Sequence, residues 1–356
     1  MSFKLPAILL FLISLAAVYC IIILQVNNTT FDQLAASRLP GAPSDADLAY
    51  TGIKALDGTL AGIIYFAWIV AEGGSTALSL FGIYLVGQVV PCSAIVLVEG
   101  LRKGNEGRIF RFSTAWSLLY QCVPWGIIMP IYCATHLWTT KSNSKSALFV
   151  NPSKISTLPI AVTIGLIIPT ILMAIPSTTP ARHNAFNALW QLFPLWIAIS
   201  QFFLSSFAPT IPQTVENSIK SLRRLYRFSL TISSVVHLSI LAISIAPGLF
   251  TQFLPLGPLE AISPTKVFAP MTPFNITKAS LREGCLHLLQ YDVFFACGST
   301  LIWSLVQWNH VTPGKNLGRV LKFLGWCLLS GPGGAALVAV WGRDEEVFGE
   351  SGRKNL

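Results

Sequence analysis

The sequence predicts an all-α protein, a polytopic integral membrane helical bundle with about eight to nine transmembrane helices. Of the 356 residues, 53% are hydrophobic and 11% are charged, whereas soluble domains carry about 25% charged residues. Apolar runs long enough to cross a bilayer as helices recur along the whole chain. We interpret the formal net charge of +9 as a loop bias toward a membrane surface. No sequence motif for nucleic acid accompanies it.

The N-terminal stretch predicts the first membrane helix. Lys4 is followed by an apolar run of about twenty residues, which is long for a secretory signal and has no clear cleavage site. We therefore predict a signal anchor or first transmembrane helix over residues 1–26. Residues 27–57 are polar and are predicted to form a lumenal loop. Overlapping sequons at Asn27 and Asn28, with a third at Asn275, predict N-glycosylation.

Eight further apolar ranges complete the predicted bundle over residues 58–342, and residues 343–356 form a predicted polar C-terminal tail. We expect the acid run Asp344-Glu345-Glu346 to be exposed on that tail. Proline inside several ranges is tolerated by membrane helices. The ranges are approximately 52–71, 76–98, 112–135, 156–177, 185–208, 228–255, 291–309 and 320–341.

The orientation of the bundle is predicted from the sequons. Lys and Arg residues are divided almost evenly between the two sides of a nine-span topology, so the positive-inside rule does not decide the orientation. All three sequons fall on the side opposite Lys4. We therefore place that side in the lumen.

A few carboxyl groups interrupt or bound the apolar ranges. Glu72 and Glu99 follow apolar runs, and Asp292 opens the eighth span. Carboxylates beside hydrocarbon are costly, so they are candidates for function. For Glu99 an equally favoured alternative is an ion pair with Arg102 or Lys103 about one helical turn further on.

The predicted crossings place Asp57, Glu99 and Asp292 at one face of the membrane and Glu72 toward the other, although a structural role is favoured for Asp57. Two carboxyl groups near one end of a bundle suit general-acid catalysis on an apolar substrate. Nearby aromatic rings could stabilise a developing carbocation through their negative faces. We predict that Glu99 and Asp292 are the catalytic acid and its partner, with Glu72 as the reserve candidate.

No cofactor or metal is predicted. The chain has no acidic DDxxD-type cluster for magnesium and diphosphate, and its five histidines show no metal-binding spacing. No glycine-rich nucleotide loop is present. Arg102, Lys103 and Arg108 are predicted to anchor their loop at lipid head groups, with neutralisation of Glu99 as a further role.

Several short motifs carry a resemblance to a known family. They are Ser79-Leu80, Gly87-Gln88, the run VEGLRKGNEGR that contains Glu99, and Tyr291-Asp292 with Trp303 downstream. With them, nearly the whole chain resembles the fungal membrane-bound terpene cyclases of the ascofuranone-pathway type. That group includes the A-type membrane proteins of paxilline-like indole diterpene clusters.

The resemblance implies a cyclase of fungal meroterpenoid or indole diterpene biosynthesis in the endoplasmic reticulum membrane. An acid would protonate an epoxidised prenyl chain, and an internal nucleophile would close a ring. It implies a hydrophobic isoprenoid substrate, the bilayer and other pathway enzymes as partners, and Tyr291, Trp303 and Gln88 as substrate-lining residues. The alternative is a non-catalytic scaffold or carrier of such a pathway. The lack of an evident internal repeat disfavours a carrier.

Overall fold

The computed structural model describes residues 3–37, 51–140, 143–175, 179–249, 262–274, 277–314 and 316–353. Over these ranges the chain is helical, without strands apart from one isolated bridge between Arg102 and Val150. The predicted all-α bundle is confirmed. The helices are α1 (Lys4–Val18), α2 (Leu24–Asn27), α3 (Thr30–Ala36), α4 (Lys54–Ala71), α5 (Thr76–Leu101), α6 (Ser113–Cys122), α7 (Trp125–Thr139), α8 (Lys145–Leu148), α9 (Pro152–Val162), α10 (Ile168–Ala174), α11 (Pro180–Gln191), α12 (Phe193–Phe207), α13 (Val215–Ile245), α14 (Pro264–Phe268), α15 (Leu281–Val311) and α16 (Asn316–Arg353).

Six helical segments of the described ranges are long and apolar enough to cross a membrane, and the pair α11–α12, bent by 64°, allows a seventh. The protein is therefore a polytopic integral membrane protein, and its described ranges hold fewer such segments than the eight to nine predicted. The segments are Lys4–Asn27, Thr76–Leu101, Pro152–Ala174, Val215–Ile245, Leu281–Val311 and Leu317–Gly349.

One source of the difference is the predicted span 112–135, which forms two helices. The chain breaks at Val123 and Pro124, between α6 and α7, because proline lacks the N–H that would continue the helix. The two helices then run back along each other: the rings of Trp116 and Tyr132 lie 5.2 Å apart, and those of Tyr120 and Trp125 lie 6.3 Å apart. The pair forms a hairpin and returns the chain to the end from which it came.

A second hairpin lies inside α16. Gly331 has φ 74°, outside the helical region, and Pro332 follows it. Arg319 and Glu346 then form an ion pair of 3.2 Å, although 27 residues of straight helix would separate them by about 40 Å. The two halves of α16 therefore pack side by side.

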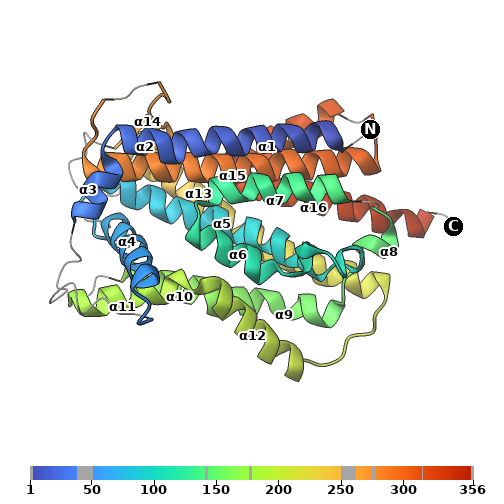
Figure 1. Cartoon of the computed structure of the whole chain (residues 1–356). Coiled ribbons are helices and arrows are strands. Elements are labelled where there is room, and N and C mark those ends of the chain that lie inside the picture. Colours follow the sequence, from blue (N-terminus) through green and yellow to red (C-terminus); the bar gives the residue numbers. More distant parts are fainter. Residues whose placement is uncertain are drawn as a thin grey trace.

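Helices α5 and α15 occupy the centre of the bundle, where they pack against each other and against α16 (Figure 1). Helix α5 also packs against α13, and α15 also packs against α7. The N-terminal helix α1 packs against α7 and α15 through Ala7, Leu10 and Ala17, which are fully buried. A capping box of Ser280 and Glu283 sets the start of α15. These contacts fix the register in which α15 presents its polar side chains.

The division into segments 1–26, 27–57, 58–342 and 343–356 remains a prediction.

Candidate active site

A cavity of about 290 Å³ lies among α4, α5, α6, α10, α11 and α15. Its walls are mostly apolar, with contributions from Phe66, Val86 and Phe193. Its volume is near the lower bound of ligand pockets in proteins, which is about 300 Å³. Among the described residues that line it, Asp292 is the only acidic side chain. The cavity thus combines an apolar wall with a single carboxyl group.

Asp292 is held in this wall by the N-terminus of α7. Its Oδ1 accepts a hydrogen bond of 2.7 Å from the backbone N–H of Gly126, one of the first N–H groups of the helix, which lack intrahelical partners. A Cβ atom at Gly126 would lie 2.8 Å from the Asp292 carbonyl oxygen, so glycine permits the close approach of α7 to α15. In the described part of the chain, no Lys or Arg pairs with Asp292.

Two aromatic rings that line the same cavity as Asp292 come from either side of the α6–α7 turn. Tyr120 lies in the last turn of α6 and donates a hydrogen bond of 2.8 Å to the hydroxyl of Ser117, and Trp125 begins α7. Both rings line the cavity. The break at Pro124 is therefore what brings a carboxyl group and two rings to one place. A ring face beside a cavity can stabilise a cation inside it.

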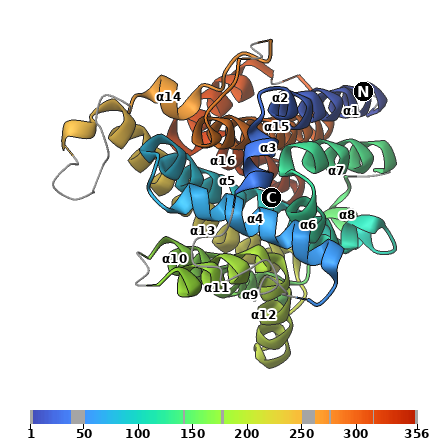
Figure 2. The same ribbon diagram turned by 60° about the vertical axis from the view of Figure 1, so that its left-hand side comes forward.

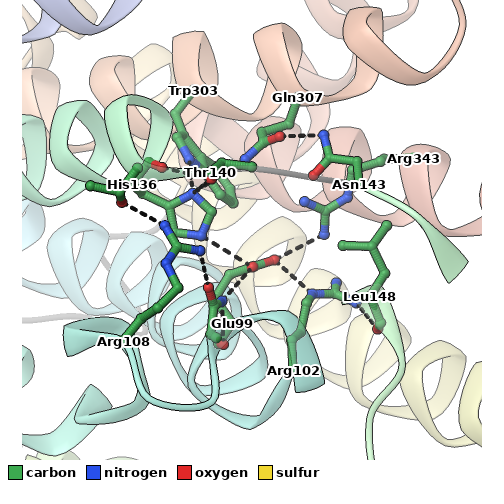
Figure 3. A network of polar contacts seen from close by, with 12 residues as sticks. Glu99, Arg102, Arg108, His136, Thr140, Asn143, Leu148, Trp303, Gln307 and Arg343 are labelled. Carbon is green, nitrogen blue, oxygen red and sulfur yellow. Dashed lines mark hydrogen bonds and ion pairs between the residues drawn. The ribbon is translucent and has the colours of Figure 1, made fainter. Parts of the chain in front are cut away.

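Glu99 lies elsewhere, in a buried ionic cluster (Figure 3). Its Oε1 accepts hydrogen bonds from Arg102 Nε at 2.8 Å and from Arg343 Nη2 at 2.9 Å. Its Oε2 is 3.4 Å from His136 Nε2. The predicted pairing of Glu99 with Arg102 is confirmed. Asn105 donates to the Glu99 backbone oxygen at 2.8 Å and holds the end of α5.

Asp344 is the second acid of this cluster. It accepts hydrogen bonds from Arg102 at 2.8 and 3.0 Å, from Arg343 at 3.1 Å and from the Tyr226 hydroxyl at 2.7 Å. Two carboxylates and two guanidinium groups give a formal charge of zero. Burial alone would lower the pKa of Arg102, but the carboxylates of Asp344 and Glu99 raise it well above its ordinary value. The cluster joins α5, α7, α13 and α16.

The cluster corrects two predictions. Arg102 is 1% exposed, so it neutralises Glu99 and is not a lipid anchor. Asp344 is fully buried, so the prediction of an exposed acid run is wrong at that position. The reason is that the second half of α16 continues through the acid run and packs it against α5 and α13.

Glu99 and Asp292 lie at different levels of the bundle, so the structure does not bring the two predicted acids together; their placement at one membrane face stays a prediction. Glu99 lies beside His136, whose ring is 5.2 Å from that of Trp303. Asp292 precedes Trp303 by eleven residues of α15, or about 16 Å of helix. The crossing count behind that prediction treated the α6–α7 hairpin as one span.

Glu72 lies at the opposite end of α15 from Glu99. It accepts hydrogen bonds from Arg282 at 2.9 and 3.1 Å, and the Arg282 side chain is half exposed. Asp57 accepts hydrogen bonds from Thr51 and Gly52 at the start of α4. These contacts agree with a structural role for both acids.

None of the three predicted substrate-lining residues lines the cavity. Trp303 is fully buried and donates to His136 Nδ1 at 3.2 Å. The Tyr291 hydroxyl donates to the backbone oxygen of Met271. Gln88 holds the tip of the α16 hairpin, where its Nε2 donates to Ser330 O at 3.2 Å and its Oε1 accepts from Gly333 N at 2.9 Å. Their assignment to the substrate stays a prediction.

The sequons differ in accessibility. Asn27 is exposed, whereas Asn28 is fully buried and its Nδ2 donates to Gln25 Oε1 at 2.9 Å. Glycosylation would require that nitrogen, so Asn27 is the accessible acceptor. Asn275 lies outside the described residues. Glycosylation stays a prediction for all three.

Sequence reasoning did not single out Tyr120, Trp125 or Gln191, which line the cavity. The Pro124 break was visible in the sequence and could have indicated the hairpin turn beside the first two residues. Gln191 gave no comparable signal. Within the described residues, no group of three His, Cys, Asp or Glu side chains could hold a metal ion.

Comparisons with known proteins match most of the chain. A CtvD domain model matches residues 6–348. The chain is 28% identical to terpene cyclase ascI of Acremonium egyptiacum, covering 86% of this chain and 83% of that protein. It is 28% identical to terpene cyclase ctvD of Aspergillus terreus, over 84% and 85%. It is 25% identical to terpene cyclase atmA of Aspergillus flavus, over 93% and 94%. No solved structure matches.

Proposed function

The chain belongs to the CtvD domain family, the fungal terpene cyclase family that its sequence resembles, and on that premise we propose that it cyclises an epoxidised prenyl chain within the membrane. The single observation that carries the proposal is Asp292, a carboxyl group that pairs with no Lys or Arg of the described residues and lies in a mostly apolar, ring-lined cavity. Glu99, the other predicted acid, is held by two guanidinium groups.

The difference in partners decides which acid we assign as the proton donor. An apolar wall favours the neutral, proton-carrying form of a carboxyl group, whereas adjacent guanidinium groups favour the carboxylate. The Gly126 N–H occupies only Oδ1 of Asp292. The other oxygen, Oδ2, can carry the proton toward the cavity. Asp292 is therefore the proposed general acid, and Glu99 a structural anion.

The proposed reaction is an isomerisation that conserves all atoms. The Asp292 carboxyl group gives its proton to the epoxide oxygen while a C–O bond breaks and positive charge develops on carbon. An alkene or hydroxyl group of the same substrate supplies the electron pair that closes the ring. The resulting cation loses a proton to the Asp292 carboxylate, which restores the acid.

The cavity walls support this chemistry in two ways. The faces of Tyr120 and Trp125 stabilise positive charge on carbon. The apolar side chains of α4, α5 and α10 keep water from the cation, which water would otherwise convert to a diol. No step requires a metal ion or an organic cofactor.

The wider setting of the proposal follows from the relatives described above, which are named terpene cyclases of fungi. The proposed setting is fungal meroterpenoid or indole diterpene biosynthesis, in the endoplasmic reticulum membrane and beside other enzymes of the pathway. An isoprenoid substrate can reach an intramembrane cavity from the bilayer itself.

The direct test is incubation of microsomes containing the protein with a prenyl epoxide and, separately, with the corresponding alkene. We expect a cyclic alcohol or ether isomeric with the epoxide, and no product from the alkene. Microsomes that lack the protein provide the control. Unchanged epoxide across a panel of chain lengths and ring groups would contradict the proposal and favour the non-catalytic scaffold.

A further inference from the structure

The cavity contains two side-chain amides that the protein itself does not use. Gln191, the last residue of α11, lines the cavity and is 6% exposed. Gln121 of α6 lines it as well. In the described part of the chain, no hydrogen bond is made by either side-chain amide. By contrast, the cavity-lining hydroxyl of Ser79 donates to the backbone oxygen of Val70 at 2.6 Å, and that of Thr170 donates to the backbone oxygen of Leu166 at 2.8 Å.

A buried amide without a partner is unusual, because covering it with hydrocarbon removes its hydrogen bonds to water and replaces them with nothing. A prenyl chain alone would cover Gln191 in this way. A substrate with an oxygen function opposite Gln191 would instead satisfy it, and the amide offers both donors and an acceptor.

Gln191 and Asp292 lie on different walls of the cavity. Helix α11 packs against α4 and α10, whereas α15 packs against α5 and α7. In both views α4 lies between α11 and α15 (Figures 1 and 2). The oxygen that Gln191 would bind is therefore separate from the epoxide oxygen that Asp292 would protonate.

We infer that Gln191, supported by Gln121, is a specificity-determining residue that binds a second oxygen function of the substrate and thereby sets which end of the chain faces Asp292. This inference rests on the proposed function for the identity of the reacting group. The amide holds the substrate at one wall, and the epoxide then lies at the other. Such a site discriminates against the same chain without the second oxygen.

The test uses the detergent-solubilised full chain and two probes. One probe is an epoxidised prenyl alcohol, and the other is the same epoxide with hydrogen in place of the hydroxyl group. Tryptophan fluorescence reports binding without turnover, because Trp125 and Trp190 line the cavity. We expect the alcohol to bind about 10- to 100-fold more tightly to the wild-type protein.

The Gln191→Leu variant should lose this preference by weakening its binding of the alcohol, while binding of the deoxy probe stays the same or tightens. Gln213→Leu, at an exposed glutamine outside the cavity, is the matched control and should keep the preference. An equal affinity of the wild-type protein for the two probes, or an unchanged preference in folded Gln191→Leu, would overturn the inference. Selective binding without any cyclisation would instead contradict the proposed function and leave the recognition by Gln191 intact.

Discussion

Two regions of the molecule hold buried carboxyl groups in opposite ways. At one end of the bundle, Glu99 and Asp344 share Arg102 and Arg343, so charge balances charge. In the mostly apolar cavity, Asp292 accepts a hydrogen bond from one backbone N–H, and no Lys or Arg of the described residues pairs with it. The comparison teaches that burial of an acid alone does not indicate catalysis. The partners decide whether the acid joins helices or carries a proton.

The largest expected effect is that of Asp292→Asn on turnover. The amide oxygen can still accept from Gly126, so the anchor of α7 is kept, but the side chain can no longer supply a proton. Loss of a general acid typically lowers the rate by about 10²- to 10⁴-fold. Product formation per unit of membrane-inserted protein is the measurement. Asp32→Asn, at an exposed acid of α3, should turn over normally.

Substitutions in the ionic cluster should lower the stability of the protein, in contrast to the loss of turnover expected at Asp292. Arg343→Gln leaves two carboxylates facing one buried guanidinium group, and breaking such a pair costs about 3–5 kcal/mol. The double variant Glu99→Gln/Arg343→Gln keeps the balanced Arg102–Asp344 pair. It should therefore be less destabilised than the sum of the two single changes. Thermal unfolding in detergent measures all three variants, and strict additivity would show that the cluster does not act as a unit.

Gln88 is a buried polar residue that belongs to neither the ionic cluster nor the cavity, so it extends the comparison to a third position. Gln88→Leu removes the hydrogen bonds from Gln88 to the tip of the α16 hairpin and leaves the Gly333 N–H without its acceptor, while the Ser330 backbone oxygen keeps its hydrogen bond from the Ser233 hydroxyl. We expect a loss of about 1–3 kcal/mol in unfolding free energy. The position of Asp292 does not depend on this tip, so turnover per folded molecule should stay near normal. A specific loss of turnover would support the predicted contact of Gln88 with the substrate.

The smallest effect should follow the loss of the Glu72–Arg282 ion pair. The Arg282 side chain is half exposed, and exposed ion pairs contribute about 0–1 kcal/mol. Arg282→Gln should therefore change neither stability nor turnover beyond that amount. A large loss of turnover at unchanged stability would restore Glu72 as a catalytic candidate.

The sequence was sufficient to predict the fold class, because a helix that crosses a lipid bilayer needs an apolar run as long as the bilayer is thick. It also predicted Asp292 as a candidate acid, because acids beside hydrocarbon stand out, and it predicted the observed pairing of Glu99 with Arg102, because local pairs follow helical spacing. It did not predict the hairpins at Pro124 and Gly331. Each lies within one continuous apolar run, and the contacts that fold it back come from distant helices.

The same limitation explains the misplaced acids. One miscounted crossing placed Glu99 at the same level of the bundle as Asp292, although the two lie at levels about 16 Å apart along the axis of α15. Asp344 was predicted to be exposed because acid runs near a chain end usually are. Its partners, Arg102 and Tyr226, are more than a hundred residues away in sequence. Gln191 could not be identified because only the cavity shows that its amide lacks a partner.

The central claim is that Asp292, and not Glu99, supplies the proton. The most direct test is the turnover of Glu99→Gln and Asp292→Asn measured side by side, each divided by the folded fraction from size-exclusion chromatography. We predict that Glu99→Gln folds less well but turns over normally per folded molecule, whereas Asp292→Asn folds normally and forms almost no product. A folded Glu99→Gln without activity, together with an active Asp292→Asn, would contradict this account and move the chemistry to the ionic cluster.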